Sequence, residues 1–183
     1  MDNTSNQRAG ASQEQPKSIF FTEMARRLAK YDVTVHKHNG RITAAIDGVA
    51  IADIFENGTI SVPNGNPGEE YSRIKKTAAD VSEYCSVYEK AAPLSMESLS
   101  GNYRCLADFN ETVLAAKYNA EYGFEFVTWT KSYDGKSVCQ GNYFTDYNAA
   151  KENFAVRSGL VDEDRIIKND LKIEPNEAPE MSM

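Results

Sequence analysis

The chain has 183 residues, 41% of them hydrophobic and 26% charged, which is typical of a soluble globular protein with one domain or two small ones. No apolar run reaches the roughly 20 residues that a membrane-spanning helix needs, and residues 1–17 lack the basic and apolar segments of a secretion signal. These features exclude a helical membrane protein, and we expect a cytoplasmic protein without a membrane partner.

The net charge of −7 is concentrated at the ends of the chain. Residues 162–183 hold seven acids against three bases and residues 1–16 hold two acids against one base, so residues 17–161 carry a net charge of only −2. A nearly neutral body has no strong field to attract phosphate groups, and it lacks the sustained negative surface of a DNA mimic. Nucleic acid is therefore not an expected partner.

The three cysteines are too far apart in the sequence to form a CxxC motif. They are Cys85, Cys105 and Cys139. Without that motif neither a thioredoxin-like site nor a zinc knuckle is available. We expect reduced thiols that pack as small hydrophobic side chains.

An N-terminal α+β half is predicted over residues 17–92, after a polar segment, 1–16, that we expect to be disordered. Residues 18–32 (SIFFTEMARRLAKYD) predict a short amphipathic helix, because apolar residues recur at helical spacing. The expected apolar face comprises Phe21, Met24, Leu28 and Tyr31.

β-branched segments separated by turn signals follow between residues 33 and 63. Asn-Gly or Asp-Gly pairs, which readily adopt the positive φ values of type I′ turns, occur at 39–40, 47–48 and 57–58. This pattern predicts a four-stranded antiparallel meander. From Glu69 onward, apolar residues three and four apart predict a long helix that covers a sheet. The expected stripe comprises Tyr71, Ile74, Ala78, Val81, Cys85 and Tyr88.

A C-terminal half of similar order is predicted over residues 93–162. Four strand-like segments lie at 102–109, 112–119, 124–133 and 136–144, and a helix follows at 146–158. Thr145 is the expected N-cap of that helix, and Gly159 with Leu160 fits a Schellman ending. Residues 163–183 are expected to fray. The predicted fold class is α+β, with antiparallel meanders each followed by a packing helix, in two similar halves.

The segment EFVTWTKSYDGKSVCQGNYF (125–144) carries aromatic residues on both faces of one predicted hairpin. One face packs on the last helix, and the other is either covered by the N-terminal half of the chain or open. An open face with the only tryptophan would form a stacking or protein-binding surface. Its candidate binding residues are Trp129, Lys131, Tyr133, Lys136 and Tyr143.

The only histidines, His36 and His38, form an HxH pair on one face of a predicted strand. Two such side chains provide two ligands for a metal, but a zinc site needs a third ligand, and no motif supplies it at fixed spacing. We found no nucleophile elbow, no phosphate-binding glycine motif and no HExxH. No cofactor is expected.

Two segments, MESLSGNYRCLADFNETVLAAK (96–117) and YGFEFVTWTKSYDGKSVCQGNYFTDYNAAKENFAVRSGLVD (122–162), resemble a C-terminal module of uncharacterised proteins from gut Firmicutes. These proteins are often encoded near conjugative or other mobile elements. The resemblance covers somewhat more than a third of the chain. It implies a bacterial cytoplasmic setting and an accessory role on a mobile element, and it assigns no functional residues.

The sequence leaves four hypotheses for function. The first is a non-catalytic module that binds another protein of its mobile element. The second is single-stranded nucleic-acid binding through the aromatic sheet face, and the third is a metal-dependent enzyme that uses His36 and His38. The fourth is an antirestriction-type DNA mimic, which the mobile-element setting favours and the charge distribution opposes.

Overall fold

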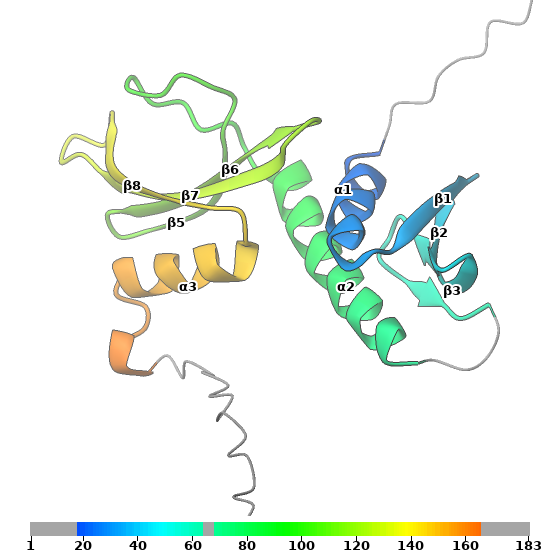
Figure 1. Cartoon of the computed structure of the whole chain (residues 1–183). Helices are drawn as coiled ribbons and strands as arrows, with labels where there is room; N and C mark the ends of the chain where they lie inside the picture. Colours follow the sequence, from blue (N-terminus) through cyan, green and yellow to red (C-terminus); the bar gives the residue numbers. More distant parts are fainter. Residues whose placement is uncertain (1–17, 64–67, 166–183) are drawn as a thin grey trace, which may run out of the picture.

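The computed structural model describes residues 18–63 and 68–165, which form an α+β fold with two similar halves (Figure 1). The first half comprises helix α1 (Ile19–Leu28), the short 3-10 helix η1 (Ala29–Tyr31), strands β1 (Thr34–His38), β2 (Arg41–Ile46), β3 (Val49–Phe55) and β4 (Ile60–Ser61), and helix α2 (Glu69–Lys90). The second half comprises strands β5 (Arg104–Phe109), β6 (Thr112–Asn119), β7 (Gly123–Lys131) and β8 (Val138–Phe144), helix α3 (Tyr147–Arg157) and the short 3-10 helix η2 (Glu163–Arg165).

Each half contains one four-stranded antiparallel sheet in which the strands follow one another in sequence order, as the turn signals predict. Asp47 and Gly48 both have positive φ, 49° and 78°, as a type I′ turn requires. At 39–40 and 57–58 only the glycine has positive φ, so the expected type I′ geometry is wrong for those two turns. The meander still forms, because a single positive-φ residue is enough to reverse the chain at these positions.

Helix α2 lies between the two sheets and joins them into one hydrophobic core (Figure 1). The ring of Tyr84 on α2 makes edge contacts with Phe124, Phe126 and Tyr147 of the second half, at centroid distances of 5.0, 5.4 and 5.7 Å. The same cluster contains Ile42 and Ile54 of the first sheet. The predicted stripe on α2 is therefore buried at its centre, while a second set of α2 residues faces the other half.

The buried face of α1 differs from the expected one. The structure buries Phe20, Glu23, Met24 and Leu28, whereas Tyr31 is 46% exposed. The face is rotated toward Glu23 because that carboxylate finds hydrogen-bond donors in the interior. Arg26 and Arg27 of the same helix and the hydroxyl of Tyr84 all donate to it.

Helix α3 packs against the second sheet through Tyr147, Ala150 and Phe154, and Arg157 donates to the carbonyl oxygen of Thr128 at 2.8 Å. The N-cap is Asp146, not Thr145, since the Asp146 carboxylate accepts the N–H of Ala149 at 2.8 Å.

The predicted Schellman ending of α3 is confirmed. The N–H of Gly159 donates to the carbonyl of Val156 and the N–H of Leu160 donates to that of Ala155. Gly159 has a φ of 74°, the left-handed conformation that this ending needs.

The predicted N-terminal tail, 1–16, lies outside the described residues, as do residues 166–183 of the predicted C-terminal tail, 163–183, whose first three residues form η2. Within residues 18–63 and 68–165, no helix combines the length and the apolar character that crossing a membrane requires. Helix α2 is long, but charged residues are spread along it.

Candidate functional site

Strand β1 is the outer strand of the first sheet and pairs only with β2 among the described elements. It forms a strand because Thr34 and Val35 are β-branched and the turn at 39–40 fixes its register against β2. His38 and Arg41 flank a two-residue turn and therefore form a hydrogen-bonded pair. Along an antiparallel ladder such pairs alternate with pairs whose backbone groups point away from the partner strand. The backbone groups of Val35 and Lys37 therefore point away from β2, toward solvent.

The other three sheet edges are each blunted. Strand β4 has only two residues. The pairing of β8 with β7 is interrupted by a register shift opposite Thr128 and Thr130 of β7 and by a left-handed residue of β8, Gln140, with a φ of 51°. Short strands, bulges and covering segments are the devices that prevent an edge from pairing with another chain.

On the fourth edge, β5, the chain covers itself. Pro93 forms a bridge with Arg104, the N–H of Leu94 donates to the carbonyl of Tyr103 at 2.8 Å, and the N–H of Cys105 donates to that of Ala92 at 2.9 Å. This covering segment belongs to the connection 91–103 between α2 and β5.

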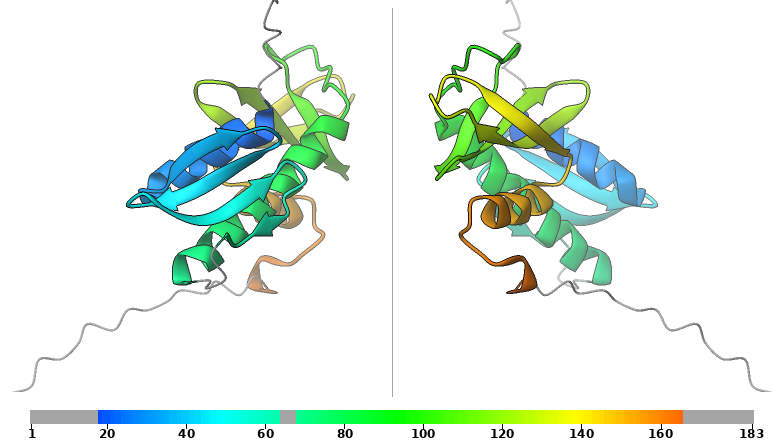
Figure 2. Two further views of the ribbon diagram at one scale, coloured as in Figure 1. Left: turned by 90° about the vertical axis from the view of Figure 1, so that its right-hand side faces the viewer. Right: turned by 90° about the vertical axis from the view of Figure 1, so that its left-hand side faces the viewer.

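The equivalent connection in the first half is too short to do the same. Only residues 32–33 separate η1 from β1, and among the described residues nothing lies along the outer side of β1. The left-hand view of Figure 2 shows the first sheet facing the viewer with α1 behind it. Of the four described sheet edges, β1 is thus the one that is regular and uncovered.

The solvent face of the first sheet carries polar side chains in rows set by the register. One row joins His38, Arg41 and Phe55, and the next joins His36, Thr43, Asp53 and Ser61. The Thr43 hydroxyl donates to Asp53 at 2.5 Å, and the Arg41 Nε lies 3.5 Å from the other carboxylate oxygen. Asp53 is thereby engaged, while His36, His38 and Lys37 are exposed.

The two histidines lie side by side on one face of β1, as the HxH spacing predicts, but the register brings no acid or cysteine next to them as a third ligand. Within the part of the chain that the structure describes, no group of three or more His, Cys, Asp or Glu side chains is placed to hold a metal ion. The nearest acid in their row, Asp53, is two strands away and bonded to Thr43 and Arg41.

The indole of Trp129 is buried, with 4% of the residue exposed. It belongs to a second, smaller core on the outer face of the second sheet, with Tyr103 and Val127, and Leu94 and Leu99 of the connecting segment pack against it. A β-carbon at Gly141 would lie 2.5 Å from the indole nitrogen, so this position needs glycine. The face is covered, but by residues 91–103 and not by the N-terminal half.

The other candidate binding residues do not form one surface with that indole. Tyr133 and Lys136 lie exposed in the β7–β8 hairpin, and Lys131 is ion-paired with Asp108 at 2.5 Å. Tyr143 is 59% exposed and makes an edge contact with the indole at 6.1 Å.

Sequence reasoning missed a polar cluster on the second sheet. Lys117 and Glu125 face each other across β6 and β7, and both bond the hydroxyl of Tyr103. Burial and the hydrogen bond to Glu125 raise the pKa of Tyr103. The phenol therefore stays neutral and links the strand pair to the connecting segment. The signal in the sequence was a lysine and a glutamate, Lys117 and Glu125, at positions that oppose each other when these two predicted strands form a hairpin.

The cysteines are unpaired, with Cys85 buried, Cys105 half-buried and Cys139 exposed. Burial, reinforced by Glu23 and Glu89, raises the pKa of Cys85 to about 12, so its thiol is protonated and unreactive at neutral pH. This thiol packs in the core, as expected for a small hydrophobic side chain.

Comparisons with known proteins add no assignment to this geometry. No family model, no curated protein and no solved structure matches the chain.

Proposed function

We propose that the chain is a non-catalytic protein-interaction module and that its partner adds an extended, acidic segment to the free edge of β1. The observation that carries the proposal is the contrast between the four described sheet edges. β4, β5 and β8 are short, covered or bulged, whereas β1 presents the backbone groups of Val35 and Lys37 without a partner. When a segment of a partner adds to such an edge as a further strand, main-chain hydrogen bonds supply the affinity of the complex.

The second half of the molecule contains an example of the proposed interaction, and this supports the proposal. There, residues 92–94 pair with β5 and bury apolar side chains against the sheet next to it. The first half has the same order of elements but a shorter connection, which leaves the matching edge to a segment from another chain. The likeness between the halves thus indicates the kind of structure that fits beside β1, which is an extended segment.

Charge determines which extended segment fits. Lys37 has no ion pair in the described part of the chain, and His36 and His38 offer ring N–H groups on the opposite face of the strand. Acidic side chains at alternate positions of an added strand would lie beside the histidines, and an apolar residue would lie beside Val35. A second copy of this strand fits less well, because β1 contains no acidic residue that could lie beside Lys37 or the histidines.

The setting is part of the proposal. The resemblance of residues 96–117 and 122–162 to a module encoded near mobile elements supports an accessory role on a bacterial mobile element. Three unpaired cysteines support a reducing, cytoplasmic compartment.

The proposal is tested with a synthetic peptide of alternating Glu and Val residues, added to the isotope-labelled full chain. The expected result is a set of backbone amide shifts confined to β1 and to the adjacent residues of β2, with the largest changes at Val35 and Lys37. A peptide of alternating Lys and Val is the matched control, and it should bind at least about tenfold more weakly.

Three results would contradict the proposal. They are equal binding of the two peptides, shifts centred on another edge, and concentration-dependent self-association of the chain through β1.

A further inference from the structure

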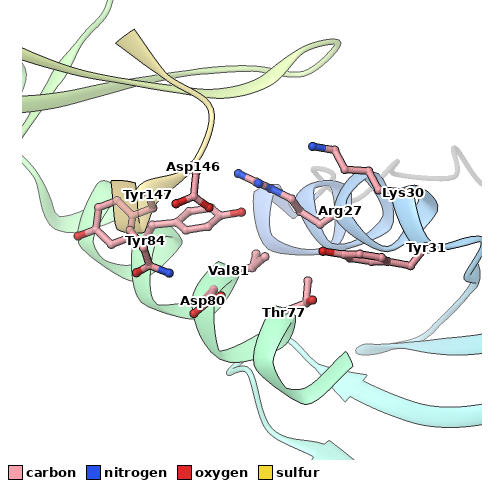
Figure 3. Close-up of a pocket in the computed structure, with 10 residues that line it drawn as sticks. Arg27, Lys30, Tyr31, Thr77, Asp80, Val81, Tyr84, Asp146 and Tyr147 are labelled. Atoms are coloured by element: carbon pink, nitrogen blue, oxygen red, sulfur yellow. The ribbon is translucent and has the colours of Figure 1, made fainter. Parts of the chain in front are cut away.

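A pocket separate from the β1 edge lies where α1, α2 and the first turn of α3 meet (Figure 3). Its volume is about 130 Å³. Val81 and Tyr84 of α2 form an apolar floor, and Tyr31 closes one side. An apolar cavity of about 150 Å³ accommodates a ligand of roughly six heavy atoms, so this pocket has room for one small molecule.

Charges of opposite sign stand on opposite sides of this pocket. Arg27 and Lys30 extend over it from the α1 side, and Asp80 lies below Val81 on the α2 side (Figure 3). No ion pair joins Asp80 to Arg27 or Lys30, and neither Asp80 nor Lys30 has a hydrogen-bond partner among the described residues. A half-buried carboxylate without a partner, facing cations across a cavity, favours a ligand that carries both charges.

The remaining polar groups agree with this polarity. Arg27 uses its Nε for Glu23 and one terminal nitrogen for the carbonyl of Thr145, which leaves the other terminal nitrogen available to a ligand. The first turn of α3 lines the pocket on the side across from α1 (Figure 3). Asp146, the other acid of the pocket, accepts the N–H of Ala149 as N-cap. The α1 side thus suits an anion and the Asp80 side suits a cation.

We propose that this pocket binds a small zwitterion, an α-amino acid with a short side chain. Its carboxylate faces Arg27 and Lys30, its ammonium faces Asp80, and its side chain contacts Val81. Because the ligand is small and part of the pocket is open to solvent, we expect a dissociation constant on the order of 1 mM. The inference is independent of the function proposed for β1, because the β1 strand and this pocket lie on different sides of α1 (Figure 1).

The test is a titration of the labelled full chain with alanine, propionate and ethylamine. Propionate lacks the ammonium group of alanine, and ethylamine lacks its carboxylate. The expected result is that alanine shifts the backbone amides of residues 77–84 and 146–148, and that each fragment binds about tenfold more weakly or worse.

Two variants assign the charges. Asp80→Asn should weaken alanine binding about tenfold and leave propionate binding unchanged or stronger. Glu152→Gln, which removes an exposed acid of α3 outside the pocket, should leave alanine binding unchanged. Equal binding of alanine and propionate, shifts that map away from the pocket, or no response far above millimolar concentration would overturn the proposal.

Discussion

Replacing Glu23 by alanine is expected to lower the free energy of unfolding by about 3–5 kcal/mol, because the change leaves buried donors without an acceptor. The Glu23 side chain is fully buried, and its carboxylate accepts hydrogen bonds from Arg26 at 2.5 Å, Arg27 at 2.9 Å and the Tyr84 hydroxyl at 2.9 Å. Tyr84 also lies at the centre of the shared core. Urea unfolding at neutral pH, followed by circular dichroism, measures this loss.

The same carboxylate should make stability depend on pH. Burial alone would raise the pKa of Glu23, but hydrogen bonds from Arg26, Arg27 and Tyr84 together with the charge of Arg26 outweigh it and hold the pKa below its ordinary value of 4.5. A lowered pKa in the folded state means that Glu23 contributes its full stabilisation above pH 4.5 and loses it as the pH falls through the folded-state value.

Glu23→Gln is the control for the charge, because it keeps the size and an acceptor oxygen. Its stability should fall less steeply than that of the native chain when the pH is lowered below the ordinary pKa of the carboxyl. An unchanged acid slope in Glu23→Gln, or a loss below about 1 kcal/mol in Glu23→Ala, would show that the cluster does not stabilise the fold.

Replacing Ile42 by alanine is expected to cost about 2–5 kcal/mol and to shift the unfolding of both halves together. Ile42 lies on β2 in the first sheet and is completely buried, whereas the only tryptophan, Trp129, lies in the second sheet. If α2 joins the sheets into one core, Trp129 fluorescence must report the loss of a side chain in the other half.

The measurement is urea unfolding of the native chain and of Ile42→Ala, followed in parallel by Trp129 fluorescence and circular dichroism. Coincident transitions that shift by the same amount are the expected result. A fluorescence transition that stays in place while the circular dichroism transition moves would mean that the halves unfold separately. Lys37→Ala, an exposed change in the same sheet at a side chain without an ion pair among the described residues, is the control and should change little.

The meanders and helices were predictable because their signals are local. Asn-Gly and Asp-Gly pairs located the turns of the first sheet, and the spacing of apolar residues located α2. The ending of α3 followed from Gly159 and Leu160, since that motif depends on a few neighbouring residues. Its N-cap was assigned one residue too early because Thr145 and Asp146 both suit that position.

The shared core and the buried acid were not predictable, because they depend on contacts between distant segments. The pattern of α2 shows one stripe, but its Tyr84 reaches the second sheet, and no local signal indicates that a helix serves two sheets. Glu23 lies between Phe20 and Met24 on the buried face of α1. A carboxylate among apolar residues of one helix face was the only indication in the sequence that an acid is buried there.

Identifying β1 as the candidate binding edge requires knowing which strands lie at the edges of the two sheets and which segments cover those edges. The sequence placed the boundary between the halves at residues 92 and 93, whereas the structure places the segment around this boundary along β5 and over Trp129. The histidines were correctly placed on one face of a strand, but the status of β1 as the uncovered edge required the strand order of both sheets.

The most direct test of the central claim compares Lys37→Pro with Lys37→Ala for binding of the Glu/Val peptide. Proline removes an N–H that points away from β2 and is tolerated at such positions of an edge strand, whereas alanine removes only the charged side chain. We predict that Lys37→Pro loses at least about tenfold more affinity than Lys37→Ala while both remain folded. Equal affinity of the two variants would contradict strand addition at β1.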